Sequence, residues 1–284
     1  MKNIQELLEF GIINLDKPSN YTSFQAAEIA GKMLKDLGVR KFSHFGTLDP
    51  LVSGVLPIAL NRACKLTTWF MKKNKTYIGI MKLHKEIEEE KLKQEMQRFV
   101  GKIIQLPPVK SRVKRQERER SVYSWKILEY DKEKKDVLFS CEVEAGTYIR
   151  KLISDLGLVI GGSHMAELRR TKAGIFSESD ENFVNLYQLE EAVKECQQGR
   201  EEKLRKLLIP GEIAIKNIIS VVEARKEKLK ELLRGKPIFN EDLNEELKLE
   251  DGKIFAVFCE DKLIGIYKKI EEGNIIARAE WVMS

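Results

Sequence analysis

The residues with the clearest potential for chemistry lie in the stretch SHFGTLDPLVSGVLP, which spans residues 43–57. It contains a single carboxylate, Asp49, which is followed by Pro50. Proline disfavours helical backbone at the residue before it, so we expect Asp49 to lie on an irregular segment. Catalytic side chains are often placed on loops of a rigid scaffold, whereas Asp-Pro with nearby glycines also forms ordinary turns. The local pattern therefore leaves both a catalytic carboxylate and a plain turn open.

The segments on both sides of this loop predict the scaffold that holds it. An unbroken apolar run over residues 55–60 follows the loop and is typical of a buried strand. Upstream, a strand at 11–15 leads into the turn DKPSNYTS. In that turn Thr22 and Gln25 form a capping-box pattern, which predicts a helix over about 23–36. A further helix is expected over 62–73.

Two more side chains lie where a site could use them. Residues 75–80 alternate like a strand, which carries Tyr77, although a half-buried strand aromatic is the commoner interpretation. A Gly-Thr pair at 146–147 starts a predicted helix over about 147–157 and places Arg150 in its first turn. By itself, Arg150 would be an ordinary arginine on a helix surface.

A basic stretch, KSRVKRQERER, covers residues 110–120 with six basic and two acidic side chains. A local excess of positive charge favours phosphate binding, because the counterions of a nucleic acid are released when lysines and arginines replace them. The same pattern also suits an ordinary exposed basic loop. Without further context the stretch indicates either one.

Composition sets the bounds of the interpretation. The chain has 284 residues, 43% hydrophobic and 33% charged, with a formal net charge of +6. These values indicate a soluble globular protein for which nucleic-acid binding is permitted but not required. The four cysteines are far apart and, with three histidines, predict no zinc site; they suggest reduced thiols of a cytoplasmic protein. We expect no signal peptide and no membrane span.

The composition shifts beyond about residue 178, and the Pro-Gly step at 210–211 marks a predicted boundary. We therefore expect two domains, at 1–210 and 211–284. The second is predicted to contain a strand at 217–222, a helix at 223–234, and strands near 254–259, 262–269 and 274–282. Residues 241–251 hold six acidic side chains and one lysine, so this face should repel RNA.

Two long motifs carry a resemblance to a known family. The pattern HxGTLDPxxxGVLP around Asp49 resembles the signature of the TruB/dyskerin family of RNA pseudouridine synthases, and GxxNLDKPxxxTS resembles its first motif. The family usually has Gly where this chain has Asn20, a residue that tolerates positive φ. The resemblance implies an α+β fold with a central mixed sheet flanked by helices. It also implies a small C-terminal β-barrel of the PUA type, which would bind RNA.

The resemblance also assigns residues. The implied catalytic set is Asp49, Tyr77 and Arg150. The implied substrate-binding set is His44, Leu168, Arg169, Arg170, Lys110, Arg112, Lys114 and Arg115.

In the family the Asp is catalytic, the aromatic at the Tyr77 position stacks on the target base, and the Leu at 168 packs against it. The arginine of GTYIR pairs with the Asp, and we expect this pair to be buried. His44 would fill the gap left by the flipped base or shape the loop. Ser43 and Phe45 depart from the family's small residues and put the geometry of the loop in question.

The stretches HMAELRRTKAGIF and PPVKSRVKRQERERSVY resemble the archaeal dyskerin-type branch. Members of this branch are catalytic subunits of H/ACA guide-RNA particles and work with small partner proteins of the Nop and Gar type. The implied substrate is rRNA or tRNA, and isomerisation of uridine needs no cofactor or metal. Two alternatives remain: a stand-alone enzyme for the T-loop of tRNA, and a non-catalytic RNA-binding scaffold.

Overall fold

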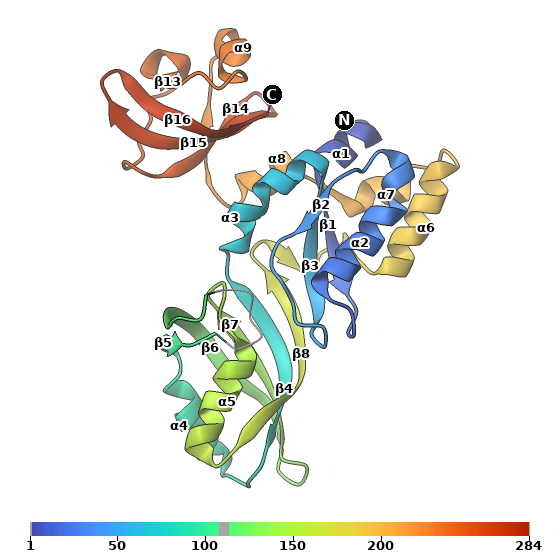
Figure 1. Ribbon diagram of the computed structural model, residues 1–284, viewed down its shortest axis with the longest axis vertical. Coiled ribbons are helices and arrows are strands. Elements are labelled where there is room, and N and C mark those ends of the chain that lie inside the picture. The colour runs from blue at the N-terminus through green and yellow to red at the C-terminus, as the bar shows by residue number, and fades with distance from the viewer. Residues whose placement is uncertain (1, 108–113, 284) are drawn as a thin grey trace. The chain divides into compact units, whose positions relative to one another are not determined.

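The computed structural model describes residues 2–107 and 114–283 and divides into two compact units, Met1–Ile209 and Pro210–Ser284 (Figure 1). Of the predicted basic residues, Lys110 and Arg112 lie outside the described residues. Each unit is described by itself below.

Unit 1 is built on one mixed sheet. Parallel pairs join β3 to β8 and β1 to β10, whereas β1 and β3, and β4 and its two neighbours, are antiparallel. The main path of the sheet runs in the order β10 (Phe183–Val184), β1 (Gly11–Lys17), β3 (Ser53–Leu60), β8 (Ser163–Ala173), β4 (Lys75–Leu83), β7 (Asp136–Val143), β6 (Arg118–Asp131) and β5 (Gly101–Gln105). Short strands pair at its sides: β2 (Phe42–His44), β9 (Phe176–Ser177) and β11 (Leu208–Pro210).

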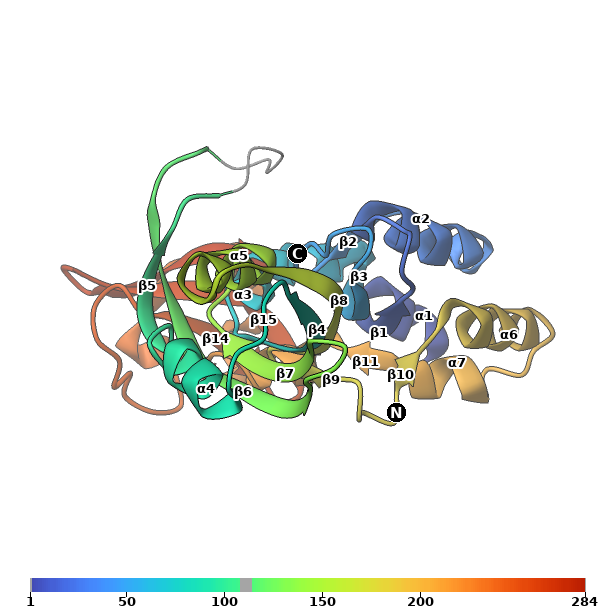
Figure 2. The ribbon, with the colours of Figure 1, turned by 90° about the horizontal axis from the view of Figure 1, so that it is seen from below.

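Helices flank this sheet in two groups, as Figures 1 and 2 show. Near β1 and β3 lie α1 (Ile4–Glu9), α2 (Ser23–Met33), α6 (Leu186–Gln197) and α7 (Glu202–Leu207). Beside the β4–β7 part lie α4 (Glu89–Gln97) and α5 (Ile149–Ile160). The predicted α+β fold, with helices around a central mixed sheet, is confirmed. The helix expected over 62–73 is instead a 3-10 segment, Asn61–Leu66, followed by the short α3, Thr67–Met71.

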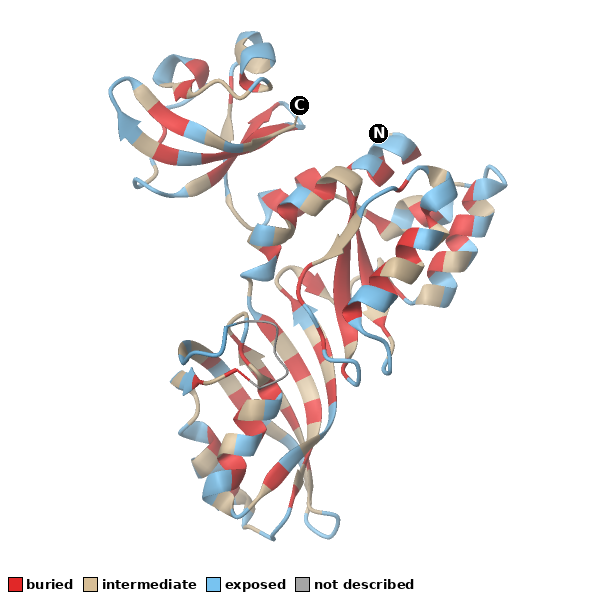
Figure 3. Cartoon of the chain, in the orientation of Figure 1, coloured by how far each residue is buried: buried red, intermediate tan, exposed pale blue. Residues whose placement is uncertain are grey.

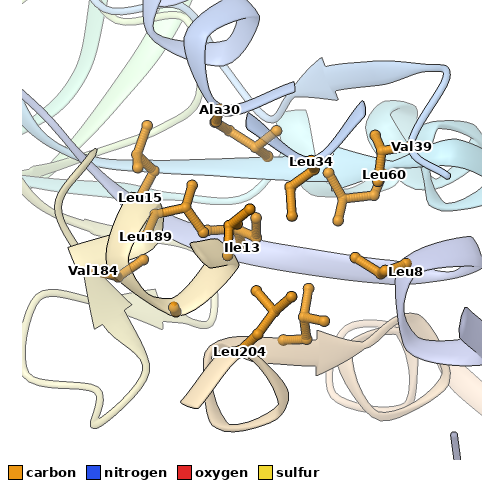
Figure 4. Packing of buried hydrophobic residues seen from close by; sticks show 14 of the residues in the cluster. Leu8, Ile13, Leu15, Ala30, Leu34, Val39, Leu60, Val184, Leu189 and Leu204 are labelled. Carbon is orange, nitrogen blue, oxygen red and sulfur yellow. The ribbon is translucent and has the colours of Figure 1, made fainter. Parts of the chain in front are cut away.

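Two hydrophobic cores correspond to the two groups of helices. One lies between β1, β3 and the helices α1, α2, α6 and α7, where Ile13, Leu15, Leu34 and Leu189 are fully buried (Figure 4). The other packs α4 and α5 against β4, β6, β7 and β8. Along β4 buried and half-buried residues alternate, which is the period of two expected for a strand with one face on a core (Figure 3). The loop of Asp49 leads directly into β3. Its residues Leu48 and Val52 pack in the second core, whereas β3 packs in the first, so the loop is anchored on both.

Unit 2 carries a five-stranded sheet in the order β12 (Ser220–Glu223), β14 (Ile254–Cys259), β15 (Lys262–Glu272), β16 (Ile275–Val282) and β13 (Ile238–Phe239). Its helical segments are α8 (Gly211–Lys216), α9 (Leu229–Leu232) and two 3-10 turns, Lys226–Lys228 and Asn240–Asp242. This curled sheet fits a PUA-like domain.

The prediction of a helix over 223–234 in unit 2 is wrong. Glu223 pairs with Phe258 in the sheet, and the Ala224 amide donates to the Phe258 carbonyl at 2.7 Å, so the chain stays extended there. Only four residues, Leu229–Leu232, then form α9. In the described part of the chain, none of the helices has the length and apolarity needed to cross a membrane.

Candidate active site

The structure brings Asp49 and Arg150 together. Asp49 lies on the irregular segment between β2 (Phe42–His44) and β3, as Pro50 predicts, and Arg150 lies in the first turn of α5. The Arg150 Nη2 atom is 2.7 Å from the Asp49 Oδ2 atom. Both side chains are 53% exposed, so the expectation of a buried pair is wrong. The carboxylate is consequently oriented by a cation and also open to an approaching ligand.

The turn at residues 17–23 fixes the backbone on both sides of Asp49. The Pro50 carbonyl accepts hydrogen bonds from the Lys17 ammonium at 3.1 Å and from the Asn20 amide at 2.8 Å. On the other side, the Ser23 hydroxyl accepts from the Leu48 amide at 2.7 Å and donates to the Leu48 carbonyl at 3.1 Å. The two sequence motifs therefore form one structural unit, in which the first holds the loop of the second.

Local sequence explains why this turn is well defined. Asn20 adopts a positive φ of 69°, which confirms the expectation that it replaces a glycine at little cost. The predicted capping box is present: the Thr22 hydroxyl accepts from the Gln25 amide, and the Gln25 side chain accepts from the Thr22 amide. These bonds start α2 immediately after the turn. The position of Ser23, and with it of Leu48, follows from the start of the helix.

Arg170 lies beneath the same loop. Its side chain is almost fully buried, at 1% exposure, and donates to the Val55 carbonyl at 2.8 Å and to the Gly46 carbonyl at 3.0 Å. Burial lowers the pKa of Arg170. Gly54 makes this packing possible, because it has a φ of 101° and a β-carbon there would lie 2.2 Å from the Arg170 carbonyl oxygen. The structure therefore places Arg170 under the loop as its support, on the side of the site, which is one of the two positions, facing the site or the RNA, that the resemblance implied.

Two buried lysines add positive charge near the loop. Lys17 is fully buried and also donates to the carbonyls of Pro18 and Tyr21; burial, then the charge of Arg170, lowers its pKa to about 8. Lys75, at the start of β4, donates to the carbonyls of Met71 and Lys73, and burial followed by Arg170 lowers its pKa to about 7. The surroundings of Asp49 are thus cationic.

Tyr77 and Leu168 lie on the neighbouring strands β4 and β8. Both are mostly buried and belong to one cluster with Leu48 and Val52, which flank Asp49 in the loop. Gly79, opposite Leu168, has no room for a side chain, because a β-carbon there would lie 2.9 Å from a Leu168 methyl carbon. Asp49, Arg150, Tyr77 and Leu168 are therefore gathered around one loop, as the family resemblance implies.

His44 and Phe45 occupy different environments. His44 is half-buried on β2; burial, then the charge of Arg170, lowers its pKa, and within the described structure its buried Nδ1 atom has no hydrogen-bond partner. Phe45 points into an aromatic cluster, stacked on Phe70 with ring centroids 4.6 Å apart and tilted against Phe176. The bulk of Phe45 is consequently absorbed by the core and does not fill the space over Asp49.

Arg169 is engaged within the protein. Its guanidinium binds both oxygens of Asp16, at 3.0 and 3.1 Å, and the Glu178 carboxylate at 2.7 Å. Lys114 and Arg115 are exposed just before β6, at a place where they are free to meet a polyanion. Residues 2–107 and 114–283 hold no group of three or more His, Cys, Asp or Glu side chains suited to a metal ion.

Lys17 is a residue that sequence reasoning missed. The sequence pattern indicates only a turn there, whereas Lys17 donates three hydrogen bonds and joins that turn to Pro50. A signal was present: a lysine at the end of the apolar run of β1, which would be buried, needs several acceptors. The structure supplies them as backbone carbonyls.

Comparisons with known proteins agree with this geometry. A model described as "TruB family pseudouridylate synthase (N terminal domain)" matches residues 34–91, and one described as "tRNA pseudouridylate synthase B C-terminal domain" matches residues 150–216. A "Probable tRNA pseudouridine synthase B" of Thermococcus onnurineus is 47% identical over 75% of this chain and 63% of its own length. A protein of the same name from Methanothermobacter thermautotrophicus is 42% identical over 78% of this chain and 67% of its own length.

Solved structures extend the likeness to the whole chain. The structure titled "Crystal Structure of a Cbf5-Nop10-Gar1 Complex" contains a chain with 35% identity and a TM-score of 0.90, covering 100% of this chain and 88% of its own. A structure titled "Structure of H/ACA RNP bound to a substrate RNA containing 2'-deoxyuridine" contains one with 34% identity and a TM-score of 0.87, covering 100% and 88%. Fold and site thus define a pseudouridine synthase domain. The chain belongs to the TruB family of pseudouridine synthases. It spans about 63% of the length of the Thermococcus relative.

Proposed function

We propose that this protein isomerises uridines in RNA to pseudouridine, with Asp49 as the catalytic residue. The observation that carries the proposal is the 2.7 Å pair of Asp49 with Arg150 on a loop whose flanking residues are fixed by the turn at 17–23. Such a loop presents one oriented carboxylate to a ligand, and it loses little further conformational entropy when the ligand binds. Membership of the TruB family supports the same chemistry.

The reaction breaks the C1′–N1 bond of uridine, turns the uracil and forms a C1′–C5 bond. As the first bond breaks, C1′ gains positive character, which the Asp49 carboxylate stabilises or attacks. The bonding electrons leave with the uracil as a delocalised anion, so no second carboxylic acid is needed. After the new bond forms, C5 loses its proton and N1 gains one. The sum is an isomerisation without any redox change.

The target base must leave its stack before the carboxylate can reach C1′. Tyr77 is proposed to stack on the flipped uracil and Leu168 to form the apolar wall behind it. His44, with its unpartnered Nδ1 atom in the described structure, is proposed to interact with the RNA at the vacated position. Because Asp49 and Arg150 are half exposed, bound RNA would be the component that excludes water from the pair.

The proposed substrates and partners follow the relatives. Chains of similar fold are titled as complexes with Nop10, Gar1 and H/ACA RNA, so we propose action within a guide-RNA particle on rRNA or tRNA. The exposed Lys114 and Arg115 would bind RNA phosphates. Unit 2, as a PUA-like domain at about 211–284, would bind RNA as well. The cysteines are free thiols in the structure, which suits the cytoplasm.

A second candidate is the stand-alone modification of tRNA. Relatives are named "Probable tRNA pseudouridine synthase B", which supports tRNA as the substrate of an enzyme that acts without a guide RNA. A scaffold without turnover is the third candidate. The gathering of Asp49, Arg150, Tyr77 and Leu168 around one loop argues against it, because RNA binding alone requires no such set.

The test is release of tritium from C5 of labelled uridine in RNA by the wild type and by Asp49→Asn. Assays contain tRNA or rRNA fragments, with and without guide RNA and partner proteins of the Nop and Gar type. Release by the wild type and a loss of at least about 1,000-fold in the variant are expected. Release that needs the guide supports the particle, and release from tRNA without it supports the stand-alone enzyme. If the folded wild type binds RNA but releases no tritium under any of these conditions, the non-catalytic scaffold is the candidate function that remains.

A further inference from the structure

Gln105 is a buried polar residue to which the site described above gives no role. It is the last residue of β5 and is 2% exposed. Its side-chain amide donates to the Tyr148 carbonyl at 3.2 Å, and its side-chain carbonyl accepts from the Tyr148 amide at 3.0 Å. A single side chain thus binds both backbone polar groups of one residue. A buried amide makes such a pair only when its partner is held at a fixed distance and angle.

Tyr148 is the residue from which α5 begins. It occupies the N-cap position, its carbonyl accepts the first helical bond from the Leu152 amide at 3.0 Å, and it makes no side-chain capping bond. Helices usually fix this end through the capping residue itself. Here Gln105, from another element, holds the capping residue through its amide and carbonyl. Arg150 follows two residues later, so the clamp on Tyr148 sets the position of the backbone from which the Arg150 side chain extends.

A second clamp holds the other end of the same segment. The Glu144 amide donates to the Ser121 carbonyl at 2.8 Å, and the Ser121 amide donates to the Glu144 carboxylate at 3.0 Å. Ser121 lies on β6, which pairs with β5, and Gln105 lies opposite Arg118 in that pair. Segment 144–148 is consequently held at both ends by the two strands of one ribbon.

We propose that Gln105 is a positioning residue of the reaction, acting through Tyr148 to hold Arg150 at the Asp49 carboxylate. The inference rests on the proposed pseudouridine synthase activity of the Asp49 site. Arg150 pairs with Asp49 but is 53% exposed and has a long, flexible side chain, so this contact alone does not fix the guanidinium. Its backbone also has to be held, and Gln105 holds it at the nearer end through Tyr148.

The test begins with Gln105→Leu, which keeps the size of the side chain and removes both hydrogen-bonding groups. We expect kcat for tritium release to fall by about tenfold to 100-fold, because small misplacements of a catalytic group have effects of this size. The KM for RNA should stay within twofold of the wild type. Gln97→Leu, at an exposed glutamine of α4, is the control and should leave both constants unchanged. An unchanged kcat in a folded Gln105→Leu protein overturns the proposal.

A double-mutant cycle separates positioning from plain loss of structure. Arg150→Lys keeps a cation but loses the planar fork, so accurate placement matters less in that background. We expect Gln105→Leu to lower kcat by less than about threefold when Arg150→Lys is present. Equal factors in both backgrounds would show that Gln105 does not act through Arg150.

Hydrogen exchange supplies a readout that does not depend on activity. In Gln105→Leu, amides of the peptide 144–152 should exchange at least tenfold faster, whereas those of β4 should not change. Unchanged exchange in 144–152 overturns the clamp whether or not the enzyme is active. Absence of tritium release from the wild type, by contrast, overturns the proposed function and leaves the exchange result to be judged by itself.

Discussion

The two units of the molecule bury charge in different ways. In unit 1, Lys17, Lys75 and Arg170 are buried near the Asp49 loop and are bound by backbone carbonyls. In unit 2, the most deeply buried charged side chain among the described residues is Asp242, a carboxylate that is fully enclosed. It accepts from the Phe239 amide at 2.9 Å and lies 3.4 and 3.6 Å from the ammonium groups of two lysines at 228 and 236.

The way in which each buried charge is compensated distinguishes the candidate site around Asp49 from the structural contact around Asp242. Carbonyl oxygens satisfy the hydrogen bonds of a cation without cancelling its charge, so Lys17 and Arg170 give the loop of Asp49 a positive potential that favours an anionic ligand. The carboxylate of Asp242 is instead paired with two lysines inside unit 2. Asp242, one of the six acidic residues at 241–251, is buried and therefore does not lie on an exposed acidic face. The predictions below test this contrast, beginning with the largest effect.

Removal of the buried guanidinium in unit 1 should have the largest effect on stability. Arg170→Met leaves the Val55 and Gly46 carbonyls without their donor, and each unsatisfied buried group costs about 1–3 kcal/mol, so we expect a loss of about 2–6 kcal/mol in the free energy of unfolding. Chemical denaturation measures it. The neighbouring Arg169→Met is the matched control and should cost about 1 kcal/mol, because that ion pair is partly exposed. Similar losses in the two variants would remove the distinction between them.

The second effect concerns pH. The pKa of Lys75 is about 7 in the folded protein and 10.5 as the ordinary value, so between these limits the unfolded chain binds more protons and the free energy of unfolding rises with pH. Below pH 7 the lysine is charged in both states and its burial opposes folding fully. Lys75→Met lacks this dependence, and its stability relative to the wild type should fall by about 1–4 kcal/mol from pH 7 to pH 10.

Denaturation curves at a series of pH values measure this difference, with Lys72→Met as the control at an exposed position. For Lys72→Met the difference from the wild type should be flat across the range. A flat difference for Lys75→Met as well would mean that Lys75 remains charged when folded, with the carbonyls of Met71 and Lys73 compensating for its burial.

The support in unit 2 should respond differently. Asp242→Ala removes the acceptor of the Phe239 amide and leaves two lysines without their carboxylate, and we expect a loss of about 1–3 kcal/mol in the stability of unit 2. Because both lysines are partly exposed, water replaces much of the lost interaction. Thermal denaturation, together with hydrogen exchange of the amides in β13 and β16, measures the loss of stability. The kcat for tritium release should stay at the wild-type value, and a lower kcat would contradict a purely structural role.

The smallest effect on stability is expected for the Asp49–Arg150 pair. Arg150→Ala should change the free energy of unfolding by about 1 kcal/mol or less, since both partners are half exposed. Its kcat should nevertheless fall by about 100-fold to 1,000-fold, as is typical when one group that stabilises developing charge is removed. Lys151→Ala, which breaks the neighbouring ion pair with Asp155 on α5, should have a similar effect on stability and none on kcat. Rates of tritium release beside denaturation curves test both.

The comparison also explains what could be predicted from sequence. The loop of Asp49, the positive φ of Asn20 and the capping box at Thr22 depend on residues close together in the chain, and pattern reasoning found them. The strand at 254–259 was likewise predicted at its observed bounds, because its apolar run has clear ends.

The supports of the site were missed because they act across the chain. Lys17 binds Pro50, 33 residues away, and Gln105 binds Tyr148, 43 residues away. The burial of Arg170 depends on parallel pairing of β3 with β8, which no local pattern predicts. The half exposure of the Asp49–Arg150 pair had the same cause: burial is a property of the assembled surface, whereas the family resemblance implied only the pairing itself.

The buried Arg170 also has a consequence for synthesis of the protein. Its partners Gly46 and Val55 precede it by 124 and 115 residues. Their carbonyls therefore lack this donor until the ribosome has made the intervening chain. At about 5–20 residues per second this delay is roughly 6–25 s, during which the apolar strand β3 lacks its neighbour β8. A nascent chain of this length is an aggregation hazard and a natural client for chaperones. The support beneath Asp49 can form only after β8, which carries Arg170, has left the exit tunnel.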